Sequence, residues 1–345
     1  MKKGFGNRLF VVTAAAAASF LLLSGFDSTL TVEDVNEKTK EALSTMNGFS
    51  ANVSGVADAS IDVAAGGETQ SLAMKGELDY SVQITEEPFA LAVSGSMAGD
   101  AAAMGVSGGL EMEMYLAQQE DGTGIVYVRV PQGEDTGWHA AALGAEDMEK
   151  MSETVKASLR GDKTAAAEQL GMDLDAINEQ IQANATLAPE AVNVNGVDCY
   201  EITQSIDGDT LFSILSEVVE AMPQAGIDSN SLSAFQMLFN GIQVDAVADV
   251  SAADFTPVYA ELDLGNSDFS MIGQMFGAMA ISSQDASQTP EISVNVNALK
   301  LSMNYEEAPE QIEIPADALA AEIETTMSLS DAAQAVEEEA AEVAE

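Results

Sequence analysis

The chain has 345 residues, of which 47% are hydrophobic, so it can bury a sizeable core. Twelve Lys and Arg residues stand against 57 Asp and Glu residues, which gives a net charge of −45. A negative field of this size repels phosphate backbones and anionic lipid surfaces, which excludes nucleic acid as a partner and favours cations and basic proteins. The single cysteine, Cys199, rules out a disulfide within the chain, so the core must supply the stability.

Residues 1–26 have the pattern of a secretory signal peptide: three basic residues, an uncharged run over 9–23, and then two small residues. The run is short for a membrane span. Residues 22–25 resemble the start of a bacterial lipobox, but Phe26 occupies the place of the lipidated cysteine. We therefore expect an exported protein, extracellular or at the cell-envelope surface and not lipid-anchored. Its signal is either cleaved near Gly25 or retained as a tether.

A helix is predicted over residues 32–46. Thr31 and Asp34 form a variant of the capping box at its start, and Asn47-Gly48 is a typical end. Apolar residues recur on one face of this segment, so it should pack against the rest of the chain by that face.

The clearest strand covers residues 72–84, where apolar and mostly polar residues alternate without interruption. This period of two gives a strand one apolar and one polar face. Its apolar residues are Leu72, Met74, Gly76, Leu78, Tyr80, Val82 and Ile84. Gly66-Gly67 predicts a hairpin to a preceding strand. Further strands are expected over 49–63, 89–97, 110–116, 125–130, 191–194, 197–206, 242–250 and 258–264.

Two turns in the second half have specific chemistry. Asn195-Gly196 is the strongest hairpin signal in the chain. Asp207-Gly208-Asp209 resembles a calcium loop, but it lacks the further ligands of that motif. We interpret it as the cap of a helix over residues 210–222.

The last elements are less regular. A long strand over 292–305 switches its apolar parity near Ala298, which predicts a β-bulge. Residues Ile312 to Pro315 are predicted to form a short edge strand, because proline cannot continue a ladder. Residues 322–345 are acidic, without a basic residue, and have few bulky apolar side chains, which is typical of a disordered or loosely helical tail.

We predict an α+β fold for residues 27–321: one large, strongly bent antiparallel β-sheet, a half-barrel, with helices packed on its concave face. The β-rich regions 49–143 and 191–305 would form two portions of this sheet. A helical insert at about 145–185 separates them in the sequence.

A resemblance to a known family rests on the order of the elements and on several short segments. These are the helix at 32–47, a long meander, Tyr127-Val128-Arg129-Val130-Pro131, Trp138, the helical insert, Asn195-Gly196-Val197-Asp198-Cys199-Tyr200-Glu201-Ile202 and Ile312-Glu313-Ile314-Pro315-Ala316. Over residues 31–321 the chain resembles the LolA-like and LppX/LprG-like exported proteins of bacteria, especially the Gram-positive branch. The resemblance implies a half-open sheet that wraps around helices and encloses an apolar cavity for acyl chains. Many members are lipid-anchored, and Phe26 departs from that pattern.

The residues that usually carry catalysis are scarce. His139 is the only histidine, so neither a catalytic triad nor a histidine-based metal cluster can form within one chain. Cys199 alternates with Val197 in a predicted strand and is expected to be a small buried hydrophobic residue. No pair of carboxylates stands out among the 57 acidic residues as a hydrolase site. We therefore expect no enzyme, cofactor or metal site.

Residues 270–280 are apolar nearly all round a helix, with methionines repeating every fourth position. Such a helix either packs beneath the sheet or forms a mobile lid over an apolar cavity, where flexible methionines adapt to irregular ligands. The candidates for lining such a cavity are Met271, Met275, Phe276, Met279, Leu211 and Leu215.

Two functional hypotheses follow. In the first, the protein is an exported, non-enzymatic carrier that holds an apolar small molecule or lipid between the bent sheet and the helices. In the second, it is an envelope-surface interaction protein with a filled core, whose acidic exterior meets cationic partners or Ca²⁺. Periodicity does not report the volume of a cavity, so the sequence leaves both open, together with the oligomeric state.

Overall fold

The structure is a computed structural model that describes residues 31–65, 68–101, 106–131, 136–159, 185–221, 236, 239–274 and 291–327. Its helices are α2 (Val32–Thr45), α3 (Ala145–Leu159), α6 (Gly208–Ala221) and α9 (Ala316–Leu319). Its strands are β1 (Gly48–Ala65), β2 (Glu68–Glu86), β3 (Phe89–Ala101), β4 (Val106–Gln118), β5 (Gly124–Arg129), β6 (His139–Leu143), β7 (Thr186–Leu187), β8 (Val192–Val194), β9 (Val197–Asp207), β10 (Gln243–Ser251), β11 (Pro257–Asp263), β12 (Glu291–Glu306) and β13 (Ile323–Met327).

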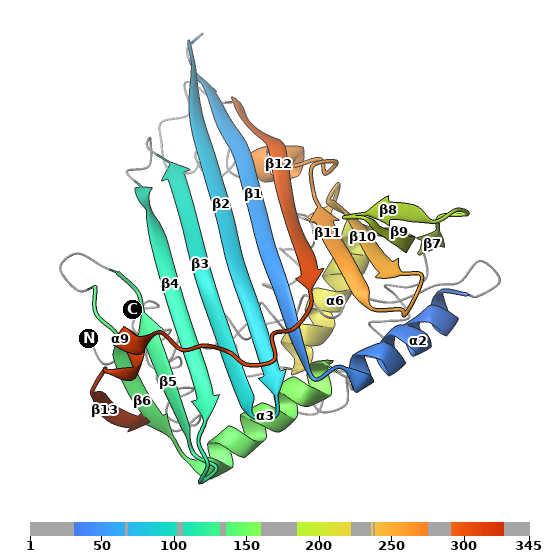
Figure 1. Cartoon of the computed structure of the whole chain (residues 1–345). Coiled ribbons are helices and arrows are strands. Elements are labelled where there is room, and N and C mark those ends of the chain that lie inside the picture. The colour runs from blue at the N-terminus through green and yellow to red at the C-terminus, as the bar shows by residue number, and fades with distance from the viewer. Residues whose placement is uncertain are drawn as a thin grey trace.

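Within these residues, thirteen strands form one open sheet (Figure 1). The order across it is β13-β6-β5-β4-β3-β2-β1-β12-β11-β10-β9-β7, with β8 paired to the outer edge of β9. Every pair is antiparallel except β13 with β6, which is parallel. The predicted sheet is confirmed, and the strand predicted over 72–84 lies within β2 near its centre.

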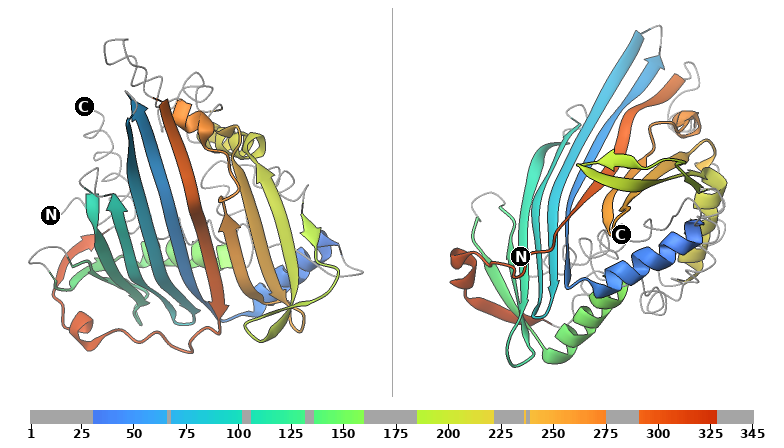
Figure 2. Two further views of the ribbon diagram at one scale, coloured as in Figure 1. Left: turned by 90° about the horizontal axis from the view of Figure 1, so that it is seen from above. Right: turned by 45° about the vertical axis from the view of Figure 1, so that its right-hand side comes forward.

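One pairing joins the two β-rich halves of the sequence. β12 runs antiparallel to β1 from Ser50↔Glu306 to Ala64↔Glu291, while β1 pairs on its other side with β2. The sheet is strongly bent, as the two views in Figure 2 show. Regions 49–143 and 191–305 are therefore two portions of one curved sheet, as predicted.

The predicted bulge in β12 is present. The register steps from Asp58↔Ala298 to Ala59↔Val296, so Asn297 is the extra residue on β12. Its side-chain Nδ2 donates to Asp58 Oδ1 at 3.1 Å, which ties the bulge to the neighbouring strand. The bulge keeps apolar side chains on one face on both sides of the parity switch.

Helices cover the concave face, as predicted (Figure 2). The start of α2 has the expected capping box, in which Thr31 and Asp34 bond to each other's backbone N–H groups. Val35 of α2 is fully buried against Val250 and neighbouring residues of β9 and β10. Met148 of α3 is fully buried against the inner side of the meander. The remainder of the predicted helical insert, 160–184, lies outside the described residues.

The predicted edge strand at 312–315 is wrong. These residues belong to a strap, residues 307–315, that crosses the outer face of the sheet (Figure 1). Ile312 packs on Ala90 and Ala92 of β3, and Ile314 joins the cluster around Tyr127. The two isoleucines pack against side chains of other strands. Their alternation therefore arises from contact with the face of the sheet, and the segment does not pair as a strand.

The acidic tail predicted from 322 also needs correction at its start. Ile323–Met327 forms β13, which pairs with β6 from Ile323↔Ala140 to Met327↔Leu143. This pairing supplies partners for the free edge of β6, which outweighs the low hydrophobicity of the segment. Residues 328–345 lie outside the described part of the chain.

The cap predicted at Asp207 is present, because the backbone N–H of Thr210 donates to Asp207 Oδ1 at 2.9 Å. We expect Asp207→Ala to lower the free energy of unfolding by about 1 kcal/mol, the usual value for loss of an N-cap. Urea denaturation checks the value, with Asp209→Ala as the control that keeps the cap. Millimolar Ca²⁺ should leave the melting temperature of the unaltered protein unchanged. A rise that Asp207→Ala abolishes would instead identify a calcium loop.

Candidate functional site

The inner face of the sheet is tightly packed near one end. Layers of apolar side chains from β1 to β5 are buried there against α3, and aromatic contacts such as Phe49 with Tyr305 add to them. The buried members include Phe49, Ala51, Val82, Ile84, Phe89, Leu91, Val93, Met112, Met114, Leu116, Val126, Val128 and Met148. Among the described residues, these buried side chains form a packed core at this end of the sheet.

Farther along the same strands the inner face stays apolar but is no longer fully buried. Leu72, Met74 and Leu78 of β2 are half-buried, and Met97 of β3 is 48% exposed. Pairing places one row across five strands, from Leu301 through Gly55, Leu78 and Met97 to Leu110. We call this part of the sheet the distal inner face.

A row of small residues crosses the distal inner face. Ala57, Gly76, Gly99 and Gly108 are in register on β1 to β4, and we call them the glycine row. A Cβ at Gly76 would lie no closer than 3.6 Å to another atom, and one at Gly99 no closer than 3.9 Å. The backbone therefore does not require glycine at these two positions. The absent side chains leave space between the Leu78 row and Met74.

The predicted lining residues are only partly described. Met271 is half-buried in a helical turn at 270–274, and Leu211 is half-buried in α6. A Cβ on Gly273 would come within 2.7 Å of the Ile292 backbone oxygen, so this turn lies against the start of β12, at the distal end. Leu215 belongs to α6, but its side chain lies outside the described residues, as do Met275, Phe276 and Met279.

Cys199 is a buried thiol, as expected from the sequence. It is 0% exposed, and burial raises its pKa to about 11. Its Sγ donates to the Val197 backbone oxygen at 3.5 Å. A thiol of this kind is a poor nucleophile at neutral pH. His139 is half-buried on β6, paired with Val128 of β5.

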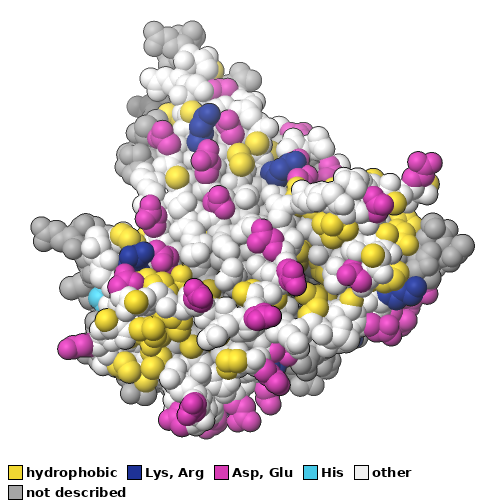
Figure 3. All heavy atoms as spheres, viewed as in Figure 1, with side chains coloured by type: hydrophobic (Ala, Val, Ile, Leu, Met, Phe, Trp, Pro, Cys, Tyr) yellow, Lys and Arg dark blue, Asp and Glu magenta, His cyan; other side chains and the backbone are white. Residues whose placement is uncertain are grey.

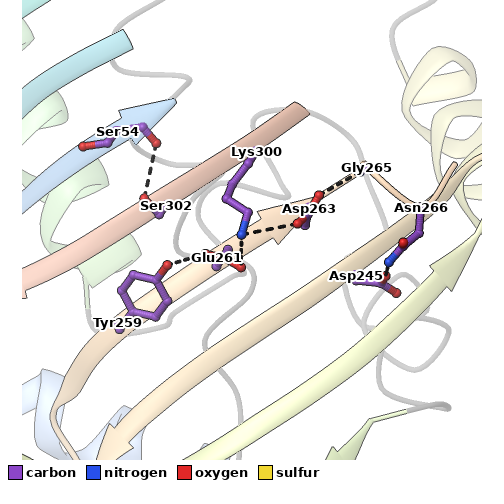
Figure 4. Close-up of polar contacts among 9 residues, drawn as sticks. All are labelled: Ser54, Asp245, Tyr259, Glu261, Asp263, Gly265, Asn266, Lys300 and Ser302. Carbon is purple, nitrogen blue, oxygen red and sulfur yellow. Dashed lines mark hydrogen bonds and ion pairs between the residues drawn. The ribbon is translucent and has the colours of Figure 1, made fainter. Parts of the chain in front are cut away.

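The outer face of β10 to β12 carries a polar cluster that sequence analysis missed (Figure 4). Lys300 Nζ lies 2.8 Å from Glu261 Oε1 and 3.3 Å from Asp263 Oδ2. Tyr259 donates to the other oxygen of Glu261, and burial together with this bond raises the Tyr259 pKa to about 12. On β10, Asp245 accepts from Asn266 Nδ2 at 2.7 Å. Period-two alternation puts these residues on one face, but only the register brings them side by side.

The rest of the described structure offers no site for an apolar ligand or a metal ion that matches the distal inner face. An open cleft of about 790 Å³ between α2 and α3 has a charged lining, including Lys40, Glu41, Glu153 and Lys156, which does not suit an apolar ligand. Over the described ranges, no three His, Cys, Asp or Glu side chains converge as metal ligands. Among the helices that the structure describes, none has the length and hydrophobicity to span a bilayer.

Comparison with known proteins gives neither a matching family model nor a matching curated protein. Similar solved structures include the Mycobacterium tuberculosis lipoprotein LppX, 9% identical, over 82% of this chain and 97% of that chain, with a TM-score of 0.31. LprF from Mycobacterium bovis is 11% identical, over 82% and 95%, with a TM-score of 0.30. A putative outer membrane lipoprotein-sorting protein domain from Vibrio parahaemolyticus is 9% identical, over 82% and 94%, with a TM-score of 0.20. LppX belongs to the group that the sequence resembles, and the fold described above rests on the strand pairing.

Proposed function

We propose that this chain is a non-enzymatic binding or carrier protein that holds an apolar, acyl-chain-like ligand against the distal inner face. The observation that carries the proposal is the glycine row. Gly76 and Gly99 are glycines that the backbone does not need, and they lie among half-buried and exposed apolar residues on the concave side of the sheet. A sheet that filled its own core would gain by placing larger side chains there.

The chemistry of the face selects the ligand class. The rows beside the glycine row are built from aliphatic side chains and methionine, as at Leu78, Met74 and Leu301, and these offer no hydrogen bonds. An alkyl chain laid across them gains about 0.8 kcal/mol for each CH₂ group that leaves water. A ligand with many polar groups would lose its hydration without compensation. Methionine side chains also adapt to chains of different shape.

The signal pattern of residues 1–26 supports a role outside the cytoplasm. Figure 3 shows acidic side chains scattered over the outer face, where they keep the protein soluble while the apolar face is turned inward. In the carrier proposed here, the two faces of the sheet have separate tasks: the inner face holds the ligand and the outer face meets solvent.

The proposal is tested by extracting the purified protein with organic solvent and measuring co-purified lipid by mass spectrometry. The extracted protein is then titrated with a fluorescent fatty acid of sixteen carbons. Bound lipid, or saturable binding of the fatty acid, is the expected result. Absence of both would overturn the carrier proposal and leave the envelope-surface interaction protein with a filled core.

A matched pair of variants locates the ligand. We expect Gly76→Leu, which fills the glycine row, to weaken fatty-acid binding at least about tenfold, because the new side chain occupies the ligand's space. Gly109→Leu places the same side chain next to Gly108 of the glycine row but on the outer face of β4, and this variant should bind like the unaltered protein. Equal affinities for the two variants would place the ligand elsewhere.

A further inference from the structure

A hairpin covers part of the outer face of the sheet. β8 and the start of β9, residues 192–199, turn at Asn195 and Gly196, whose φ angles of 52° and 87° fit a tight hairpin turn. At the tip, Asn195 Nδ2 donates to Asn304 Oδ1 of β12 at 3.1 Å. Figure 1 shows this hairpin in front of β10 and β11. We call residues 192–199 the cover hairpin.

The cover hairpin lies over one row of the sheet. Asp249 of β10 pairs with Tyr259 of β11, and Tyr259 pairs with Asn304 of β12. The hairpin starts from β9, which borders β10, and its tip reaches Asn304, so it spans the row that begins with Asp249. Asp249 is on the outer face of the sheet. The hairpin over this row explains why its side chain is only 2% exposed.

Asp249 is buried without compensation. Its Oδ1 has no hydrogen-bond partner, and among the described residues no cation lies within ion-pair distance of it. Burial, followed by repulsion from Glu201 and Glu261, raises its pKa to about 6. Burial in this setting therefore favours the protonated form of the Asp249 carboxyl over the ionised form.

None of the neighbouring charges stabilises the ionised form of Asp249. Glu201 faces Asp249 directly across the β9–β10 pair. Glu261 of β11 is already engaged by Lys300 of β12 and by Tyr259. The Cys199 thiol, at the base of the hairpin, has a pKa raised in part by Asp249, so it is neutral as well. Among the described residues, the charged groups that act on Asp249 are therefore the carboxylates Glu201 and Glu261, and both are negative.

We propose that the cover hairpin is a pH-dependent flap, closed over β10 and β11 while the Asp249 carboxyl is protonated and loosened when that carboxyl ionises. In the open state Asp249 meets water and regains an ordinary carboxyl pKa. The Asp249 carboxyl therefore binds its proton more weakly in the open form than in the closed form. Opening is suppressed at low pH, grows as the pH rises from about 4 to about 6, and levels off above the pKa of the closed form.

The only cysteine of the chain reports the opening. Cys199 lies at the base of the hairpin, is 0% exposed, and should react with a neutral disulfide such as dithiodipyridine only when the flap opens. The rate of labelling is measured from pH 4.5 to pH 7.5 in the unaltered protein and in Asp249→Asn, whose side chain does not titrate. The ratio of the two rates cancels the intrinsic pH dependence of the thiol.

We expect the ratio of the unaltered protein to Asp249→Asn to rise at least about tenfold over this range. Removing the Asp249 charge would itself make Cys199 more acidic and more reactive, which acts in the opposite direction and so cannot produce the rise. Asp245→Asn is the matched control on the same face of the same strand. Hydrogen bonds from Asn266 and then Gln243 hold the Asp245 pKa low, so this variant should follow the unaltered protein.

Hydrogen exchange of residues 192–200, corrected for intrinsic rates, gives a second measurement that does not depend on the thiol. Protection that falls with rising pH in the unaltered protein and stays constant in Asp249→Asn supports the flap. A labelling ratio that is constant with pH, or a loss of the pH dependence in Asp245→Asn as well, overturns it.

Discussion

Gly95→Ala is expected to lower the free energy of unfolding by about 3 kcal/mol or more, although it adds a single methyl group. Gly95 lies in β3, opposite Tyr80 of β2. A Cβ at this position would overlap the backbone oxygen of Asp79 and lie 2.6 Å from Tyr80 Cα and 2.7 Å from its ring. The obstacles are mainly backbone atoms of a central strand, which cannot rotate away, so the sheet must shift.

Gly76→Ala is the matched control, because it also adds a methyl group to a strand glycine of the inner face. Its Cβ would lie 3.6 Å from Ala57 Cβ and 3.8 Å from the Ala98 backbone oxygen, both ordinary contacts. This change should be neutral or stabilise by up to about 1 kcal/mol, since alanine restricts the unfolded chain more than glycine does. Urea denaturation of both variants gives the difference. Equal stabilities would mean that β2 and β3 are farther apart than described.

Met148→Ala is expected to cost about 2–5 kcal/mol. Met148 is 0% exposed and anchors α3 in the cluster beneath β1 to β5. Its side chain lies directly over Gly124, where an added Cβ would come within 3.2 Å of Met148 Cγ. Truncation leaves a cavity between helix and sheet that rigid strands cannot close. The loss is measured by urea denaturation.

Lys150→Ala serves as the control in the same helix. Lys150 Nζ lies 2.7 Å from Glu146 Oε1, but the two side chains are 60% and 82% exposed. An exposed pair one helical turn apart contributes little, so the change should stay within about 0.5 kcal/mol. If Met148→Ala costs no more than Lys150→Ala, α3 is not part of the core, and the enclosure of the inner face that the carrier proposal needs is lost.

Elements whose pattern is local were predicted well. The alternation over 72–84 predicted β2, and the parity switch near Ala298 predicted the bulge that the structure places at Asn297. The turn signal at Asn195-Gly196 and the caps at Thr31 and Asp207 were confirmed as well. Each of these features depends on φ and ψ preferences, on hydrogen bonds within three residues or on the side-chain period. All three can be predicted from residues that are close in the sequence.

The strap and β13 show where local pattern fails. The alternation of Ile312 and Ile314 is the same for a strand in a ladder and for an extended segment lying across one. Residues 323–327 have no strong strand signal, and they become β13 because the edge of β6 offers unpaired backbone groups. In both places the partner, which is distant in the sequence, selects the structure.

The sequence by itself predicted that apolar residues would line one face of long strands and that the two β-rich halves would join in one sheet. Only the tertiary structure decided which glycines fall in one row and which carboxylate is covered. Gly76 and Gly99 become neighbours through the register of β2 and β3, and Asp249 is buried because a hairpin from β9 reaches β12. Side-chain period fixes the face on which a residue lies, whereas register and long-range contact fix its neighbours, and a binding face or a buried charge depends on those neighbours.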